Sequence, residues 1–287
     1  KIDRSDSKAR ALSSIVSALA EKGNFGMATK VAKKIDRSDS KARALSSIAA
    51  SQSATDKESA AKTFEMATKV VEGMYDSDSK ARALSSIVSA LAEKGNFGMA
   101  TKVVEGIDDY YDKARALSSI AASQSATDKE SAAKTFEMAT KVAKKIDDYY
   151  DKAEALSSIA ASQSATDKES AAKTFEMATK VAKKIDRSHY KARALSSIVS
   201  AQIRSKSGLD ALKTIKLVTH RRNIYLYEIA RLFSYSSDKE NFKLLLPECK
   251  YYPDTAYMVC ALLCFFYPEK IMQIKSLMDV NFSMLKN

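Results

Sequence analysis

The sequence predicts an all-α protein, built as a solenoid of antiparallel helix pairs. The octapeptide KARALSSI begins at residues 8, 41, 80, 113 and 191, and a sixth copy at residue 152 reads KAEALSSI. The copies are therefore 33, 39, 33, 39 and 39 residues apart, a spacing typical of stacked helical repeats. The 287 residues include only seven Gly and three Pro. Such a low content of turn residues favours helix over sheet.

Each repeat is predicted to hold two helices: helix A, which carries the octapeptide, and helix B, which follows it. In the 33-residue unit an apolar stripe at helical spacing runs along helix A. It consists of Leu12, Ile15, Val16 and Leu19. Gly23 is expected to end helix A, and Asn24 to cap helix B. The apolar side of helix B consists of Phe25, Ala28, Ala32 and Ile35. Neither helix can bury its stripe alone, so the pairs must stack.

The 39-residue unit is predicted to have a longer helix B. Phe64 stands six residues further from its octapeptide than Phe25 does. The added residues include Thr55 and Glu58 at the spacing of a capping box. Behind them, apolar residues keep a helical spacing at Ala60, Phe64, Ala67, Val71 and Met74. We therefore expect about a turn and a half of extra helix, not a flexible loop.

The connections between units are acidic, and one of them contains Asp108, Asp109 and Asp112. These residues lack the spacing and the glycine of an EF-hand loop. Because acidic side chains interact favourably with a helix N-terminus, we interpret them as caps and expect no metal site. Tyrosines in the same connections are expected to pack between units, with stacking on a ligand as the alternative. They are Tyr110, Tyr111, Tyr149 and Tyr150.

The copies diverge after residue 200. We interpret residues 1–200 as a near-identical repeat array and residues 201–287 as degenerate helical repeats that close the C-terminal end of the same solenoid. Helices are predicted over Leu209–Thr219, Ile224–Tyr235 and Thr255–Tyr267, and a last one ends near Val280. Ser237 and Glu240 have the spacing of a capping box. Cys260 and Leu263 are expected to face inward.

The cysteines indicate a reducing compartment. Cys249, Cys260 and Cys264 are odd in number and form a poor disulfide framework. Since no His lies near them in the sequence, we interpret them as buried thiols rather than metal ligands. The longest apolar run, residues 256–267, is too short to span a bilayer about 30 Å thick. An intracellular, cytoplasmic protein is predicted. The opening KIDR recurs inside later repeats, so we expect the sequence to begin within a repeat, and targeting signals can lie outside it.

The 33-residue helix pair has Leu12 early in helix A, Gly-Asn-Phe at the turn and Ala28 four residues after Asn24. In these features it resembles the tetratricopeptide repeat. The resemblance covers roughly residues 5–200 and implies a right-handed superhelix whose helices A line the concave face. Leu12 stands where that family often has Trp, and Asp36 near where it often has Pro. The 39-residue units also exceed its usual period. The chain more weakly resembles the pentatricopeptide repeat, a family that binds RNA.

If helices A line a groove, residues between their apolar positions face it. One such set is an arginine ladder, interrupted by a glutamate: Arg10, Arg43, Arg82, Arg115, Glu154 and Arg193. The other is a serine row: Ser13, Ser46, Ser85, Ser118, Ser157 and Ser196. Guanidinium groups suit carboxylates and phosphates. The alternative is that each arginine pairs with an acidic residue of the adjacent unit and stabilises stacking.

These features predict a non-enzymatic scaffold that binds a partner protein or extended peptide, acidic in character, on the concave helix A face. Single-stranded RNA is the alternative partner, in keeping with a net charge of +12, although the helix from Lys8 to Glu21 has no aromatic ring on which a base could stack. With two His, no Gly-rich phosphate loop and no nucleophile elbow, the sequence offers little from which to build an active site. No cofactor is expected. The oligomeric state, and whether the array is natural or engineered, stay open.

Overall fold

A computed structural model describes residues 4–218, 222–235 and 244–249, together with residues 259, 260, 264 and 272. Throughout these residues the regular structure is helical and no strand occurs. The chain divides into two compact units, Lys1–Ile146 and Asp147–Asn287, and each is described by itself. The boundary at residue 200, where the sequence copies diverge, falls inside the second unit and within a helix.

The first unit holds four helix pairs. The helices that carry the octapeptide are α1 (Arg4–Glu21), α3 (Ser38–Gln52), α5 (Ser77–Glu93) and α7 (Tyr110–Gln124). The helices that follow them are α2 (Phe25–Lys33), α4 (Lys57–Glu72), α6 (Phe97–Glu105) and α8 (Lys129–Ala143).

The second unit continues the pattern with two further octapeptide helices. They are α9 (Tyr149–Gln163), paired with α10 (Lys168–Lys183), and α11 (Ser188–Arg204), paired with α12 (Gly208–Ile215). Its remaining described elements are α13 (Arg222–Tyr235) and a 3₁₀ turn at Leu246–Cys249.

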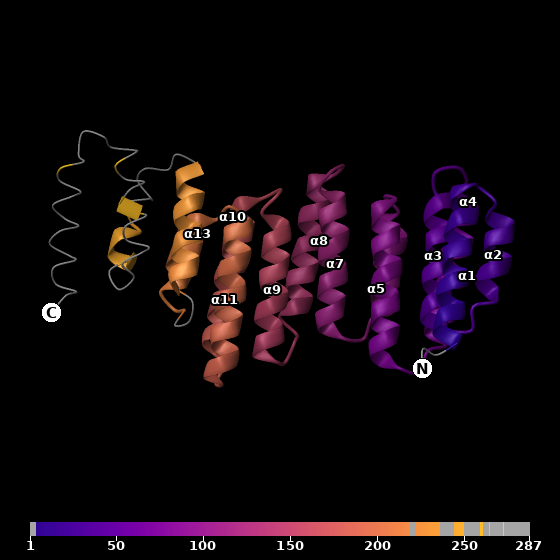
Figure 1. Ribbon diagram of the computed structural model, residues 1–287, viewed down its shortest axis with the longest axis horizontal. Coiled ribbons are helices and arrows are strands. Elements are labelled where there is room, and N and C mark those ends of the chain that lie inside the picture. Colours follow the sequence, from indigo (N-terminus) through magenta and orange to yellow (C-terminus); the bar gives the residue numbers. More distant parts are fainter. Residues whose placement is uncertain are drawn as a thin grey trace. The chain divides into compact units, whose positions relative to one another are not determined.

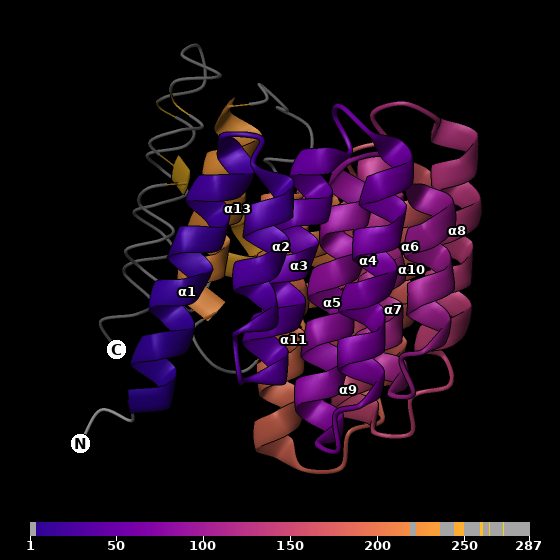
Figure 2. The same ribbon diagram turned by 90° about the vertical axis from the view of Figure 1, so that its right-hand side faces the viewer.

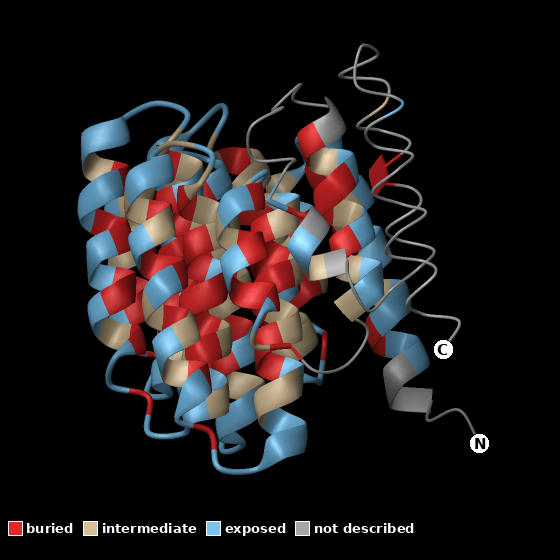
Figure 3. Cartoon of the chain, turned by 90° about the vertical axis from the view of Figure 1, so that its left-hand side faces the viewer, coloured by how far each residue is buried: buried red, intermediate tan, exposed pale blue. Residues whose placement is uncertain are grey.

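Within each unit the helices A pack side by side. α1 contacts α3, α3 contacts α5, α5 contacts α7, and in the second unit α9 contacts α11. Each helix B packs against its own helix A and against the next helix A of the unit, and the helices A of the first unit follow one another in chain order (Figures 1 and 2). Buried positions gather where helices face one another, and exposed ones on the connections (Figure 3). The prediction of an all-α stack of antiparallel helix pairs is confirmed.

The predicted apolar stripe of helix A is buried where helices lie on both sides of it. In α5 the four equivalent residues are 0–2 % exposed: Leu84, Ile87, Val88 and Leu91. The turns after α1 and α5 also follow the prediction, because Gly23 and Gly95 adopt φ values of +72° and +73°, which glycine reaches without steric cost. The Asn24 side chain accepts a hydrogen bond from the amide of Met27 at 3.4 Å.

The long helices B confirm the predicted extra turns, but the predicted cap is one residue out. The N-cap of α4 is Asp56, whose carboxylate accepts hydrogen bonds from the amides of Glu58 and Ser59 at 3.1 and 3.0 Å. Thr55 instead donates its hydroxyl hydrogen to the carbonyl of Gln52. Aspartate and threonine both serve as caps, and the sequence alone does not show which of two adjacent candidates adopts the extended backbone of the cap.

The same aspartate cap recurs in α8 and α10, at Asp128 and Asp167. In α8 the Ser131 hydroxyl donates to the Asp128 carboxylate at 2.6 Å, and the Ser131 amide donates at 3.0 Å. These hydrogen bonds, that of the hydroxyl first, hold the pKa of Asp128 below its usual value. Asp109 caps α7 in the same manner, with its carboxylate accepting from the amide of Asp112 at 2.9 Å.

The diverged part confirms one of the predicted helices and shortens another. α13 covers Ile224–Tyr235, whereas α12 ends at Ile215 and not at Thr219. The predicted capping box at Ser237 and Glu240, the helices of residues 255–280 and Leu263 lie outside the described residues. Cys260 is buried, as predicted, and burial raises the pKa of its thiol. Among the described helices, none is long and apolar enough to cross a membrane.

Candidate interaction surface on the helix A layer

The predicted arginine ladder lies on adjacent helices, one residue per helix. In the first unit Arg10, Arg43, Arg82 and Arg115 stand at the same position of α1, α3, α5 and α7, and all four side chains are exposed. In the second unit the position holds Glu154 on α9, which is partly buried, and the exposed Arg193 on α11. The ladder therefore presents repeated guanidinium groups on the surface of the helix A layer.

Ion pairs between a helix A and the connection that follows its helix B involve lysine and not arginine in the described residues. Lys8 lies 2.8 Å from Asp36, and Lys80 lies 4.0 Å from Asp108, each the first residue of an octapeptide paired with the next connection. Among the described residues, no carboxylate lies within 4.0 Å of the five ladder guanidiniums. The guanidinium of Arg82 instead donates to the Ser79 hydroxyl at 3.2 Å.

An acidic side chain lies close to the ladder between α5 and α7. Asp112 is partly buried, and burial, followed by the nearby Asp109 carboxylate, raises its pKa. Arg115 and Arg82 act in the opposite direction. Asp112 is therefore close enough to interact electrostatically with both arginines, although it forms no direct ion pair with either.

The serine row lies deeper than the arginine ladder. Ser46, Ser118 and Ser157 are 2–4 % exposed. Their short-unit counterparts are partly buried: Ser13, Ser85 and Ser196. Ser46 donates its hydroxyl hydrogen to the Ala42 carbonyl of its own helix at 2.8 Å. These serines are buried or partly buried, so the accessible part of the predicted surface is the arginine ladder.

The single glutamate of the ladder belongs to a cluster that sequence reasoning did not assemble. Arg193 lies over the ring of Tyr150, 5.5 Å from its centroid. Tyr150 meets Tyr190 edge to face, with centroids 5.7 Å apart. Burial, and next the Glu154 carboxylate, raise the pKa of the Tyr150 phenol, and Arg193 opposes this shift. The prediction that tyrosines pack between units is confirmed for Tyr150.

Other tyrosines at the starts of helices A remain exposed, including Tyr110, Tyr149 and Tyr190. A cavity of about 530 Å³ lies beside the last two, between residues 148–151 and residues 185–190. Lys152 lies over the Tyr149 ring at 5.6 Å, and Arg187 over the Tyr190 ring at 5.9 Å. The sequence did not predict Arg187 and Tyr190 as residues of a candidate site. The one sequence feature that could have pointed to them is their position just before an octapeptide.

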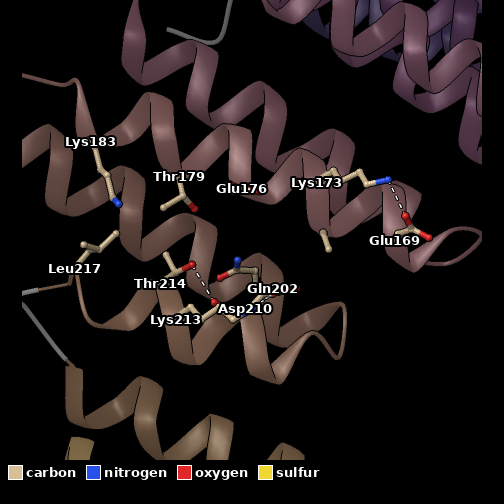
Figure 4. A pocket seen from close by; sticks show the side chains of 11 residues that line it. Glu169, Lys173, Glu176, Thr179, Lys183, Gln202, Asp210, Lys213, Thr214 and Leu217 are labelled. Atoms are coloured by element: carbon tan, nitrogen blue, oxygen red, sulfur yellow. Dashed lines mark hydrogen bonds and ion pairs between the residues drawn. The ribbon is translucent and has the colours of Figure 1, made fainter.

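A second cavity, of about 550 Å³, lies between α10 and α12. Figure 4 shows Thr179 on one side of it and Gln202 and Thr214 on the other. Its charged rim is largely neutralised within the chain, because Lys173 pairs with Glu169 at 2.7 Å and Lys213 with Asp210 at 3.4 Å. This cavity lies on the helix B side and contains none of the predicted site residues.

Gln202, on the wall of this cavity, stands where the short units have Leu19 and Leu91. The side chain is 2 % exposed, and its carbonyl oxygen has no hydrogen-bond partner among the described residues. A buried, unpaired polar group costs about 1–3 kcal/mol. We therefore expect Gln202→Leu to increase the free energy of unfolding of the full chain by about 1 kcal/mol, measured as a higher thermal midpoint. Gln202→Ala is the control, which removes the amide but leaves a void. A lower midpoint for Gln202→Leu would show that the carbonyl has a partner such as bound water.

The layered helix pairs and their repeated surface arginines define a helical-repeat protein. No protein-family model and no curated protein matches the chain. Among solved structures it is similar to the crystal structure of Ton1535 from Thermococcus onnurineus NA1, with 15 % identity, TM-score 0.38, and coverage of 96 % of this chain and 98 % of that chain. It is also similar to a circular tandem repeat protein with novel repeat topology and enhanced subunit contact surfaces, with 13 % identity, TM-score 0.29, and coverage of 96 % and 63 %. Likenesses at this level define no family, and the tetratricopeptide resemblance stays a prediction.

Proposed function

We propose that this chain is a non-enzymatic scaffold that binds a partner protein or an extended peptide of acidic character along its helix A layer. The observation that carries the proposal is the arginine ladder of the first unit. Four exposed guanidiniums stand on the four helices A of the first unit, each of which packs against the next helix A, and none has a carboxylate within 4.0 Å in the described part of the chain.

The chemistry of the ladder supports an acidic partner. A guanidinium group presents a planar fork of donors that matches a carboxylate, and it stays charged at any physiological pH. Repetition on adjacent helices allows one extended ligand to meet several such groups at once, so that weak surface contacts add up. In the described part of the chain, the ion pairs from an octapeptide to the connection that follows its helix B are formed by Lys8 and Lys80 and not by these arginines.

Fluorescence anisotropy with a labelled peptide of about 20 residues, rich in Glu, tests the proposal. We expect the peptide to bind the full chain. We expect the fourfold variant R10A/R43A/R82A/R115A to bind it at least about tenfold more weakly, because each lost charge-assisted contact contributes a few tenths of a kcal/mol or more.

A matched variant separates position from net charge. Changing Lys30, Lys69, Lys102 and Lys141 to Ala removes the same four charges from equivalent positions of α2, α4, α6 and α8. This variant is expected to keep most of the affinity. Equal losses in the two variants would contradict a specific helix A surface and would indicate attraction to overall charge.

Single-stranded RNA is the alternative partner, and one observation favours it. The exposed rings of Tyr110, Tyr149 and Tyr190 stand at the starts of α7, α9 and α11, and such rings can stack on bases. Titration with a labelled oligouridine at two salt concentrations tests this function. Tight binding that falls steeply with salt and is lost in a triple Tyr→Ala variant would favour RNA over the acidic peptide.

A further inference from the structure

The first octapeptide helix has an apolar face that its later copies bury. Ile15 of α1 is 48 % exposed. The same isoleucine of the octapeptide is 0–1 % exposed in α3, α5, α7 and α11, where it is Ile48, Ile87, Ile120 and Ile198. The residues are chemically identical, so the difference comes only from what covers them.

The neighbours of Ile15 on this face follow the same pattern. Ala11 is exposed and Leu12 is partly buried, whereas Ala44 and Leu45, at the same positions of α3, are 5 % and 1 % exposed. The adjoining side of α1 is packed, since Ala9, Val16 and Ala20 are 0–4 % exposed. One side of the helix, which we call the leading face (Ala11, Leu12, Ile15 and Leu19), therefore lacks a cover.

The later copies show what covers a leading face. α3 packs against both helices of the preceding pair, α1 and α2, and α5 packs in the same way against α3 and α4. α7 packs against α5 and α6, and α11 against α9 and α10. In all four cases the cover is a helix pair of this repeat. The ion pair between Lys8 and Asp36 joins α1 to the connection that leads from α2 into α3.

We propose that the leading face of α1 is a docking surface for a further helix pair of the same repeat. The sequence up to and into the start of α1 supports this occupant, because residues 1–7, KIDRSDS, are identical to residues 34–40. Residues 34–37 form the connection from α2 to α3, and residues 38–40 are the first residues of α3. The face and the segment that leads to it thus both match the junction that receives a preceding pair elsewhere in the chain. This inference does not depend on the proposed function.

The test places such a pair in front of the full chain. A second copy of residues 8–33 is added directly before Lys1, which reproduces the α1–α2 junction without a new sequence, and Ile15→Ala is then made in both the parent and the extended chain. In the parent, we expect hydrogen exchange of the α1 amides to change by less than about twofold, because the side chain is largely exposed and Ala favours helix. In the extended chain, the same substitution removes a buried side chain and should speed exchange at least about tenfold.

Two controls keep the result interpretable. An extension of the same length rich in Gly and Ser should leave Ile15→Ala as mild as it is in the parent, and Ile87→Ala in the parent gives the size of the effect at a covered leading face. Equal effects of Ile15→Ala in parent and extended chains would overturn the proposal, whether or not the added pair folds. So would a dimer of the parent, measured by light scattering, that persists unchanged in the extended chain, because a second copy would then hold the face.

Discussion

Replacing Phe175 with Ala is expected to lower the local stability of the second unit by about 3–5 kcal/mol. Phe175 lies on α10 and is 0 % exposed, among the largest fully buried side chains. The substitution removes its contacts and leaves a cavity between α10 and the helices A beside it. Since repeat proteins need not unfold in one step, the loss is best measured by hydrogen exchange of the α9, α10 and α11 amides in the full chain.

The short units provide a matched control for this substitution. Phe97 occupies the equivalent position of α6, but it is the first residue of that helix and is only partly buried. Phe97→Ala should therefore cost less than half as much as Phe175→Ala. Phe136 of the long α8, 2 % exposed, should behave like Phe175. Equal costs at Phe97 and Phe175 would contradict the explanation that the longer helix B encloses this ring.

Replacing Gly208 with Ala is expected to destabilise the second unit by about 1–3 kcal/mol, the usual cost of overpacking. Gly208 is buried at the first position of α12, where α13 approaches it closely. A Cβ atom there would stand 2.5 Å from a ring carbon of Phe233 and 3.1 Å from a methyl carbon of Leu232. Because the ring is itself buried, α12 and α13 must move apart, and thermal unfolding of the full chain should show a lower midpoint.

The opposite sign is expected at Gly98, the second residue of α6. A Cβ atom there would meet nothing within 4 Å, and glycine in a helix costs about 0.5–1 kcal/mol relative to alanine. Gly98→Ala should therefore raise the stability of the first unit by about that amount. Two substitutions of identical chemistry then differ in sign, and a shared sign would contradict the close approach of α13 to Gly208.

The repeated sequence was sufficient to predict the helices of the array, because apolar periodicity, turn residues and caps are local features of the sequence. The stripe of Leu84, Ile87 and Val88, the glycine turn at Gly95 and the lengthened α4 all depend on residues within a few positions of one another. The cap of α4 was predicted one residue early, since Thr55 and Asp56 are both suitable and the choice depends on the backbone path out of α3. α12 was predicted too long because the diverged sequence keeps an apolar pattern beyond Ile215, where the helix ends.

The candidate surface was predictable in part for the same reason. Arg10, Arg43, Arg82 and Arg115 fall between apolar positions of helix A, and they are exposed as that pattern requires. The serines fall between apolar positions as well, but Ser46 and Ser118 are buried, and both belong to units with a long helix B. A hydrophobic stripe identifies one buried side of a helix and does not reveal a second contact made by small residues.

The sequence alone determined the repeat, the helix pairs of the array, the longer helix B of the 39-residue units and the arginines that stay at the surface, since all of these depend on short-range periodicity and capping. Tertiary structure decided which copies of an identical octapeptide are covered. Ile15 and Ile48 are the same residue in the same eight letters, yet one is 48 % exposed and the other 0 %. Burial is a property of neighbours that pack across units, and no residue encodes it alone. The grouping of Tyr150, Tyr190, Arg193 and Glu154 from two helices was decided in the same way.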